Sequence, residues 1–248
     1  MFASIAHIFT IICYQPLLNL LVFTYNIVPG HDIGVVIIII TLLIKIVLYI
    51  PSRSTIKAQK AMTDLQPKIN AIKEKFKDNK EQQALETMKL YKEHKINPLS
   101  SCLPLLIQLP FLIAIYQVFM VGLQNGSLDL LYPFVANPGH INSLAFGFLE
   151  MSKPQFILAL LAGAAQFWQT KMMMAKRPEV KTQDSKDEDM AAIMSRQMTI
   201  MMPIMTVIIG WNLPSGLVFY WLLLTVFTAL QQLITLKKKK DLPVEVIG

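Results

Sequence analysis

The sequence predicts an all-α integral membrane protein with five transmembrane helices, an N-terminal amphipathic helix in the membrane interface and a cytoplasmic helical hairpin. The first observation is composition, because 54% of the 248 residues are hydrophobic and only 16% are charged, which is too apolar for an ordinary soluble domain. The second is that several apolar stretches approach the roughly 20 residues that a helix needs to cross a bilayer. The third is that the basic residues gather between those stretches. The predicted spans are 33–50, 99–123, 154–174, 197–212 and 215–236.

The distribution of lysine and arginine sets the predicted orientation. Apart from Lys45 and Lys153, these residues lie in three blocks, at 53–95, 171–196 and 237–240. Because loops rich in Lys and Arg stay in the cytoplasm, we expect the N-terminus outside and the C-terminus inside. The connecting segments are then an outer segment 1–32, a cytoplasmic hairpin 51–98, an outer loop 124–153, a cytoplasmic loop 175–196 and a basic cytoplasmic tail 237–248.

Two placements are open for the apolar segment 2–28, which is long enough to span a membrane but carries several polar residues. We favour a helix from about Pro16 to Val28 that lies in the outer interface, because a proline suits a first helical turn. The Pro-Gly pair that follows would make the turn into the first span. No lysine or arginine precedes Lys45, so the basic region of a secretory signal is missing and we expect this segment to be retained.

Lys45 is a strongly basic residue inside the first predicted span. A central lysine costs roughly 2.5–3.5 kcal/mol on insertion scales and each Leu, Ile or Val returns about 0.3–0.6 kcal/mol, so the aliphatic run still inserts. One interpretation is snorkelling, because Lys45 lies five residues before Ile50, about 8 Å along a helix from the cytoplasmic end. The other interpretation turns the charge inward, into a pocket wetted from the cytoplasm and lined by glutamines and threonines of other spans. The residues alone leave both interpretations open.

The segment 51–98 is predicted to form two helices joined by a turn at the polar run KDNK, residues 77–80. Apolar residues recur at helical spacing in its first half, at Leu65, Ile69, Ile72 and Phe76. Residues 52–98 carry 11 basic and 6 acidic side chains, and 11 − 6 gives a net charge of +5. Such a hairpin can be simply solvated, or it can dock on lipid headgroups, ribosomal RNA or a targeting receptor. The candidate docking residues are Lys73, Lys75 and Lys77, with Lys237, Lys238, Lys239 and Lys240 in the tail.

The sequence lacks the residue patterns of a catalytic, metal or coupled-transport site. It contains no HExxH, GxSxG or P-loop motif, and Asp and Glu are absent from the interiors of the predicted spans. Cys13 and Cys102 have neither metal-site nor disulfide-framework spacing. We therefore expect no enzyme, no metal, no cofactor and no small-molecule substrate. Sequence-specific nucleic-acid binding is not expected either, because base-reading motifs and interleaved aromatics are missing.

Four stretches of the sequence carry a family resemblance. They are DLQPKI (64–69), ETMKLYKEHKINPLSSCLPLLIQLP (86–110), NLPSGLVFYW (212–221) and LQQLI (230–234). With them the chain resembles the bacterial YidC branch of the YidC/Oxa/Alb membrane-protein insertases, from about residue 15 to residue 237. It is similar to a minimal core of that family, because the large periplasmic domain of Gram-negative members is missing.

The resemblance implies a five-helix fold with an outer amphipathic helix and a hydrophilic groove that opens toward the cytoplasm and the lipid. Lys45 occupies the position of the groove charge, where the family usually has arginine. Lysine keeps the charge but loses the planar fork that binds a carboxylate through two hydrogen bonds. The candidate polar residues and client contacts of the groove are Gln108, Gln166, Gln169, Tyr220 and Trp221. The resemblance leaves open which of Gln166 and Gln169 matches the family's glutamine.

The function that the resemblance implies is a membrane protein insertase or chaperone of the bacterial cell membrane. It would move nascent transmembrane segments from the cytoplasm into the bilayer without covalent chemistry. Its expected partners are nascent membrane proteins, the lipid bilayer, the ribosome and the Sec translocon. Two alternatives are a small solute channel or transporter, which would need a polar path through both leaflets, and an assembly chaperone that binds clients without inserting them.

Overall fold

A computed structural model describes residues 7–97, 103–121, 128–173 and 199–237 of the chain. These residues are mostly helical and include one two-stranded antiparallel hairpin. The elements are the π-helix η1 (Thr10–Tyr14), α2 (Gln15–Ile27), the short helix η2 (Pro29–His31), α3 (Ile33–Val47), α4 (Tyr49–Lys75), α5 (Lys80–Glu93), α6 (Leu103–Val121), η5 (Leu128–Leu130), β1 (Leu144–Ala145), β2 (Leu149–Glu150), α7 (Phe156–Met173) and α9 (Ser215–Lys237). A further helix, Thr199–Gly210, precedes α9.

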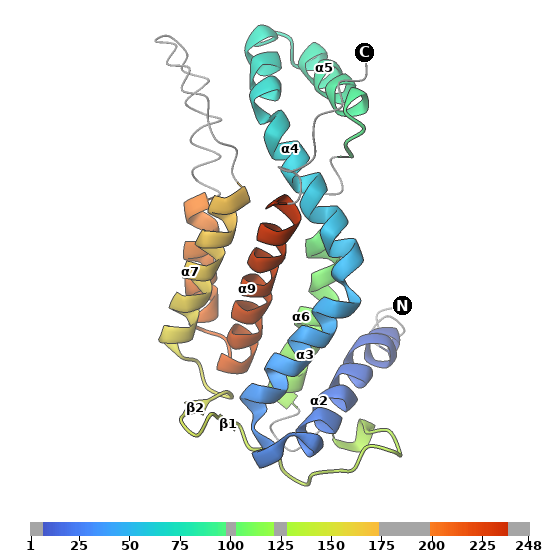
Figure 1. The fold of residues 1–248 in the computed structure, drawn as a ribbon, viewed down its shortest axis with the longest axis vertical. Helices are drawn as coiled ribbons and strands as arrows, with labels where there is room; N and C mark the ends of the chain where they lie inside the picture. Colours follow the sequence, from blue (N-terminus) through green and yellow to red (C-terminus); the bar gives the residue numbers. More distant parts are fainter. Residues whose placement is uncertain (1–6, 98–102, 122–127, 174–198, 238–248) are drawn as a thin grey trace.

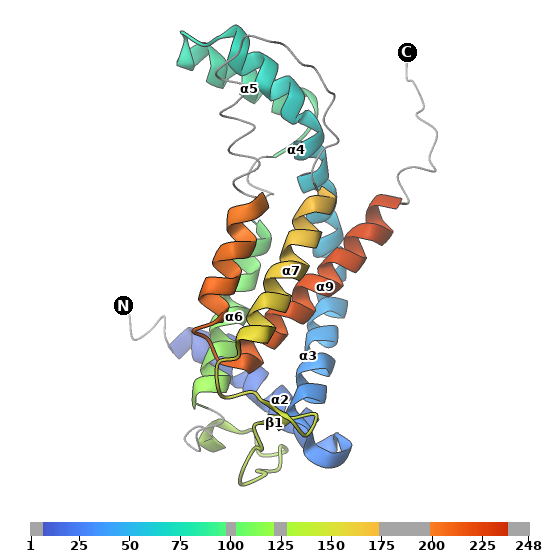
Figure 2. The same ribbon diagram turned by 90° about the vertical axis from the view of Figure 1, so that its left-hand side faces the viewer.

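The helices form a bundle with an arm at one end. α3, α6, α7 and α9 run side by side along the long axis, and α2 crosses this group obliquely near the end that carries β1 and β2 (Figure 1). At the opposite end α4 projects beyond the bundle and α5 folds back beside it (Figure 2). The prediction of a mostly helical protein is confirmed.

Two of the described helical stretches are long and apolar enough to cross a membrane, His7–Ile27 and Ser215–Leu236. α3 and α4 would provide a third span if the bent pair is counted as one. The apolar stretches Gln108–Met120 and Thr199–Gly210 are shorter. Within the described residues, length and composition therefore support two or three spans, and the count of five stays a prediction.

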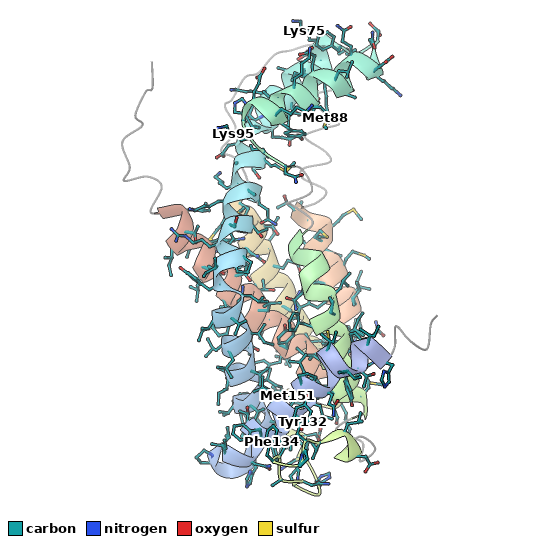
Figure 3. All side chains as sticks on the ribbon, turned by 90° about the vertical axis from the view of Figure 1, so that its right-hand side faces the viewer. Lys75, Met88, Lys95, Tyr132, Phe134 and Met151 are labelled. Carbon is teal, nitrogen blue, oxygen red and sulfur yellow. The ribbon has the colours of Figure 1, made fainter. Side chains whose placement is uncertain are left out.

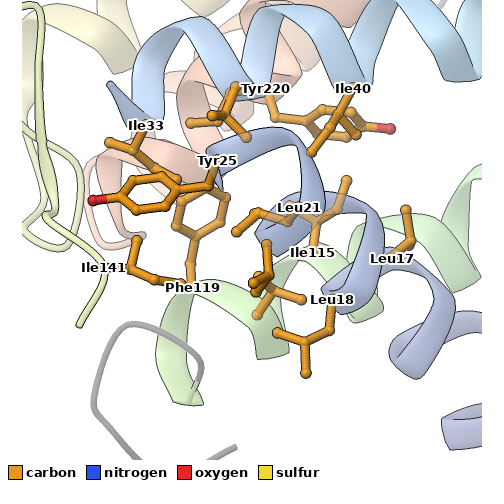
Figure 4. Packing of buried hydrophobic residues seen from close by; sticks show 14 of the residues in the cluster. Leu17, Leu18, Leu21, Tyr25, Ile33, Ile40, Ile115, Phe119, Ile141 and Tyr220 are labelled. Carbon is orange, nitrogen blue, oxygen red and sulfur yellow. The ribbon is translucent and has the colours of Figure 1, made fainter. Parts of the chain in front are cut away.

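The buried core lies where α2, α3, α6 and α9 meet. Leu18 and Val22 of α2, Val36 of α3 and Val118 of α6 are at most 1% exposed. Figure 4 shows side chains from these helices and Tyr220 of α9 gathered in one cluster. In lipid, such contacts stabilise a bundle through close packing rather than through exclusion of water. The packing fixes α2 against the helices that carry the candidate site.

α2 runs from Gln15 to Ile27 with Pro16 in its first turn, close to the predicted helix 16–28. The helical stretch continues backward through η1 to His7, which is further than predicted. Its exposed large apolar side chains include Ile8, Ile11, Ile12, Phe23 and Ile27. An apolar outer face suits both a spanning and an interfacial helix, so the placement in the interface stays a prediction.

Polar residues of α2 hold the segment that follows α6. The side-chain amide of Asn19 donates to the carbonyl oxygen of Leu130 at 3.1 Å, and its oxygen accepts the N–H of Tyr132 at 2.6 Å. The Tyr25 hydroxyl accepts the N–H of Asn142 at 2.9 Å. These polar residues of an otherwise apolar helix therefore satisfy backbone groups of the predicted outer loop.

Asp32 joins the β1–β2 hairpin to the start of α3. One carboxylate oxygen accepts the N–H groups of Gly34 and Val35 at 2.8 and 3.1 Å, which caps the helix. The other oxygen accepts the N–H of Phe146 in the hairpin turn. A Cβ atom at Gly34 would lie 2.6 Å from the Phe146 ring, so the glycine permits this close approach. The hairpin turn thus sits directly on the first turn of α3.

The same end of the bundle also fixes the start of α9. The backbone N–H of Ser215 donates to the carbonyl of Lys153 at 3.1 Å, and that of Gly216 donates to the carbonyl of Met151 at 2.9 Å. These bonds satisfy N–H groups that a helix start leaves without intrahelical partners. A Cβ atom at Gly216 would overlap the Phe119 ring of α6. α3, α6 and α9 are therefore all tied together at this end.

The first predicted span is interrupted, because α3 ends at Val47 and α4 begins at Tyr49. The two helices are bent by 72° at this break. Pro51 provides the physical reason, since it has no N–H for the carbonyl of Val47 and its ring would clash with that carbonyl in a continuous helix. In the first turn of α4 the missing donor costs little. Lys45 consequently lies in the last turn of α3, next to the bend.

α4 and α5 form the arm that projects from the bundle. Asn79 caps the start of α5, because its side-chain oxygen accepts a backbone N–H of that helix at 3.0 Å. Gln83 of α5 donates to the carbonyl of Lys73 in α4 at 3.1 Å. Leu65 and Ile69 of the predicted apolar stripe are buried. The two helices therefore pack on each other, and their location in the cytoplasm stays a prediction.

Candidate functional site

The Lys45 side chain reaches from α3 to α9. Its ammonium donates to the hydroxyl oxygen of Thr228 at 2.6 Å, and the residue is half-buried. The next two residues of α3, Ile46 and Val47, are 69% and 77% exposed on the outside of the bundle. Lys45 is thus directed between helices rather than along the exposed face of α3. This geometry matches the inward-facing interpretation, and the role of the charge stays a prediction.

The hydrogen-bond partner of Lys45 is polar but uncharged. The printed sequence has no Asp or Glu in α3, α6, α7 or α9. The ion pairs that join described residues, Lys60–Asp64 and Lys89–Glu86, both lie on the arm. Within the described part of the chain, Lys45 has no carboxylate partner. An ammonium has three N–H donors, so Thr228 leaves donor capacity for another group.

Gln231 contacts the chain on the other side of the bend. Its side-chain oxygen accepts the Ser52 hydroxyl at 2.9 Å, and its amide donates to the carbonyl of Tyr49 at 3.1 Å. Thr228 and Gln231 are three residues apart and share one face of α9. Sequence reasoning missed both as site residues, although Gln231 lies in the quoted LQQLI stretch.

Gln108 and Tyr220 are two predicted site residues that the fold brings together. The side-chain amide of Gln108 in α6 donates to the Tyr220 hydroxyl in α9 at 2.9 Å. Tyr220 is only 1% exposed. It lies eight residues before Thr228, about 12 Å along α9. This pair therefore links α6 to α9 at a different level from Lys45.

The remaining candidates lie on α7 and α9. Gln166 of α7 forms a hydrogen bond with the hydroxyl of Thr206 in the helix Thr199–Gly210. Gln169 and Trp221 are half-buried. Within the described residues, Lys45 is not hydrogen-bonded to either glutamine. The fold therefore does not decide between Gln166 and Gln169 as the groove residue.

The described candidate docking lysines lie at or just beyond the ends of α4 and α9. Lys73 and Lys75 close α4, Lys77 lies in the turn, and all three are exposed. Figure 3 shows Lys75 at the arm and Tyr132 and Phe134 at the opposite end of the molecule. Lys237 ends α9. Lys238, Lys239 and Lys240 lie outside the described residues.

Comparison with known proteins identifies relatives over most of the chain. A family model described as 60Kd inner membrane protein matches residues 23–242. The membrane protein insertase YidC of Fusobacterium nucleatum subsp. nucleatum is 34% identical over 227 residues, which is 91% of this chain and 97% of that protein. The membrane protein insertase YidC of Pelobacter propionicus is 34% identical over 235 residues, which is 94% of this chain but 40% of that protein.

A solved structure has the same fold. It is described as an active YidC insertase crystal structure with the first transmembrane domain resolved. It superposes with a TM-score of 0.57 at 26% identity and covers 88% of this chain and 45% of that chain. The chain thus spans nearly the whole Fusobacterium relative and less than half of the other two proteins. The chain belongs to the 60Kd inner membrane protein family, in which these relatives are named membrane protein insertase YidC.

Proposed function

We propose that this chain inserts nascent transmembrane segments from the cytoplasm into the lipid bilayer, without covalent chemistry. The names of its relatives and the match over most of the chain support this proposal. The single observation that carries the mechanism is the half-buried Lys45 ammonium, which is turned toward α9 and meets the neutral hydroxyl of Thr228. A cation in that position attracts acidic groups of a client.

The proposed path is a hydrophilic groove beside α3 and α9. A client carboxylate would form a charge-assisted hydrogen bond with Lys45, roughly twice as strong as a neutral one. The groove would shorten the apolar barrier for the client's polar tail, and the apolar segment would then leave into lipid because of its own hydrophobicity. The proposed client contacts along this path are Gln108, Gln166, Gln169, Tyr220 and Trp221.

The proposed topology has five spans, with the N-terminus outside and the C-terminus in the cytoplasm. α3, α6, α7, the helix Thr199–Gly210 and α9 would cross the bilayer, and α2 would lie in the outer interface. Charge supports this orientation, because residues 52–98 around the arm carry a net charge of +5 and residues 124–152 contain no Lys or Arg. The arm then faces the ribosome and the Sec translocon, which are proposed partners.

Reconstitution of the purified chain in liposomes tests the proposed function. A ribosome-synthesised single-span client with an acidic translocated tail is added, and insertion is scored as protection of the tail from protease. We expect protected tail with the wild-type chain and none with empty liposomes. We expect Lys45→Ala to weaken insertion of the acidic-tailed client and Lys45→Arg to retain it, because arginine keeps the charge.

Lys57→Ala is the matched control, because Lys57 is exposed on α4 and its loss changes net charge by the same amount. Unchanged insertion by the Lys45→Ala variant would return Lys45 to the snorkelling interpretation. Absence of protection with the wild-type chain would contradict the insertase proposal itself. Ion flux through the same liposomes without client insertion would favour a channel instead.

A further inference from the structure

The bend between α3 and α4 is spanned by two side chains of α9. Lys45 lies three residues before Leu48, where the break occurs, and bonds to Thr228. Tyr49 and Ser52 lie just after the break and both bond to Gln231. Thr228 and Gln231 of α9 therefore bond to the chain on both sides of the bend.

Thr228 is oriented by its own helix. Its hydroxyl hydrogen is donated to the carbonyl of Leu224 at 2.6 Å, one turn earlier in α9. A hydroxyl has one hydrogen and two lone pairs, so this bond leaves only acceptor capacity toward α3. The hydroxyl oxygen therefore faces Lys45 as an acceptor, and the ammonium donates a hydrogen bond to it at 2.6 Å.

Gln231 uses both ends of its amide across the break. The oxygen accepts from the Ser52 hydroxyl and the nitrogen donates to the carbonyl of Tyr49. Gln231 is only 7% exposed. If α4 moved away, the buried oxygen and nitrogen of its amide would lose their hydrogen bonds, which costs free energy. Hydrogen bonds with both a side chain and the backbone fix the first turn of α4 in distance and in rotation.

We propose that Thr228 and Gln231 are positioning residues that form a latch, in which Thr228 holds the Lys45 ammonium and Gln231 holds the direction of the α4–α5 arm. This inference rests on the proposed function for its role in insertion. The latch couples the two ends of the bend, because both residues belong to one rigid face of α9. An acidic client that binds a remaining N–H donor of Lys45 pulls on the ammonium that Thr228 holds, strains this half of the latch and loosens the arm.

The arm amplifies small changes at the bend. α4 has 27 residues, so at 1.5 Å per residue its far end lies about 40 Å from the break. A change of about 10° in the bend would then move that end by about 7 Å, by simple leverage over that helix length. Release of Gln231 should therefore be visible as a shift or broadening of distances measured to the tip of the arm.

Spin-label distance measurement on the full chain in lipid nanodiscs tests the latch. Cys13 and Cys102 are replaced by alanine, and labels are placed at Lys80 and Lys171, which are exposed on α5 and α7. We expect Gln231→Leu to broaden the distance distribution or shift its centre by several ångströms, as the leverage above requires. Leu230→Ala, at an exposed neighbouring position, should leave the distribution unchanged.

The Ser52–Gln231 pair provides an internal check. Ser52→Ala should reproduce part of the Gln231→Leu effect and add little to it in the double variant, because both remove the same bond. A distribution for Gln231→Leu that matches the wild-type chain and the Leu230→Ala control would overturn the latch. This measurement needs no client. It can therefore refute the latch while the insertion assay supports the insertase function, and it can support the latch while the insertion assay shows no activity.

Insertion assays test the Thr228 half of the latch. Thr228→Val keeps the shape but removes the acceptor, and Thr228→Ser keeps the acceptor. We expect Thr228→Val to lower the ratio of acidic-tailed to neutral-tailed client insertion by about tenfold, because one hydrogen bond to a charged group is lost. We expect Thr228→Ser to keep the wild-type ratio, because serine keeps the acceptor. Equal ratios for Val and Ser would contradict the assignment of Thr228 as the residue that positions Lys45.

Discussion

At the scale of single residues, the position of Lys45 depends on a proline six residues later. Pro51 stops α3 at Val47, so the lysine lies in the last helical turn and can reach α9. Had α3 continued to residue 50, the same side chain would lie deeper in a straight helix. Composition shows that such a span can carry a lysine, but only the bend and Thr228 give the ammonium a defined contact.

Glu150 provides a pH-dependent prediction at the end of the bundle that carries β1 and β2. Hydrogen bonds from Ser143 and then Ser152 lower its pKa below the ordinary value of 4.5. Because the folded pKa is depressed, this stabilisation is complete above about pH 4.5 and is lost as the pH falls through the folded value. We expect the protection factors of amides in the β1–β2 hairpin to fall below pH 4.5, measured by hydrogen exchange and corrected for the intrinsic pH dependence of amide exchange. In Glu150→Gln this pH dependence should disappear, and an identical acid response in that variant would refute the assignment.

At the scale of elements, the bend gives a prediction for Pro51→Ala. Alanine restores an N–H that can bond to the carbonyl of Val47 and removes the ring that clashes with it. We expect the 72° bend to decrease and α3 and α4 to approach one continuous helix. The check is the distance between labels at Lys80 and Lys171, which should shift as a single narrow peak. An unchanged distance would mean that the latch residues, and not the proline, set the bend.

The helices themselves could largely be predicted, because their signals are local. Pro16 lies in the first turn of α2, but it does not mark the start of the helical stretch, which continues back through η1 to His7. The apolar run from Ile33 predicts α3, but it does not predict the break at Leu48, because a proline at the end of an apolar run fits both the end of a span and a bend. The five-span count also went beyond what the described helices support by length and composition.

Contacts between distant segments could not be predicted. Asn19, Tyr25 and Asp32 bond to backbone N–H groups that lie more than one hundred residues away in the sequence. A hydrogen bond of this kind leaves no periodicity in the sequence. The roles of Thr228 and Gln231 could not be predicted for the same reason, because helical spacing does not indicate which neighbouring helix a polar side chain contacts.

At the scale of the whole molecule, the two ends of the bundle differ in character. The end with β1 and β2 is fixed by backbone hydrogen bonds and close glycine contacts. The other end carries a projecting arm and the polar contacts of α9 with the bend. We expect the β1–β2 end to move less than the arm end, because these hydrogen bonds and close contacts fix it.

The arm also gives a prediction about docking. Lys73→Gln, Lys75→Gln and Lys77→Gln together remove three exposed charges near its tip. Each basic residue near an anionic surface contributes about 1 kcal/mol, so binding to anionic vesicles or ribosomes should weaken by about two orders of magnitude at low salt. Co-sedimentation measures this loss. Lys89→Gln serves as the control because Lys89 is paired with Glu86, and equal losses for both variants would contradict a specific docking role.

A charge swap between position 45 and the client tests most directly whether Lys45 contacts the client tail. Lys45→Glu is reconstituted in liposomes without a membrane potential, and insertion is compared for clients whose tails carry either aspartates or lysines. If the side chain at position 45 contacts the tail, the wild-type chain should favour the acidic tail and the Glu variant the basic one. The same preference in both chains, or none in either, would contradict an insertase whose client contact is Lys45.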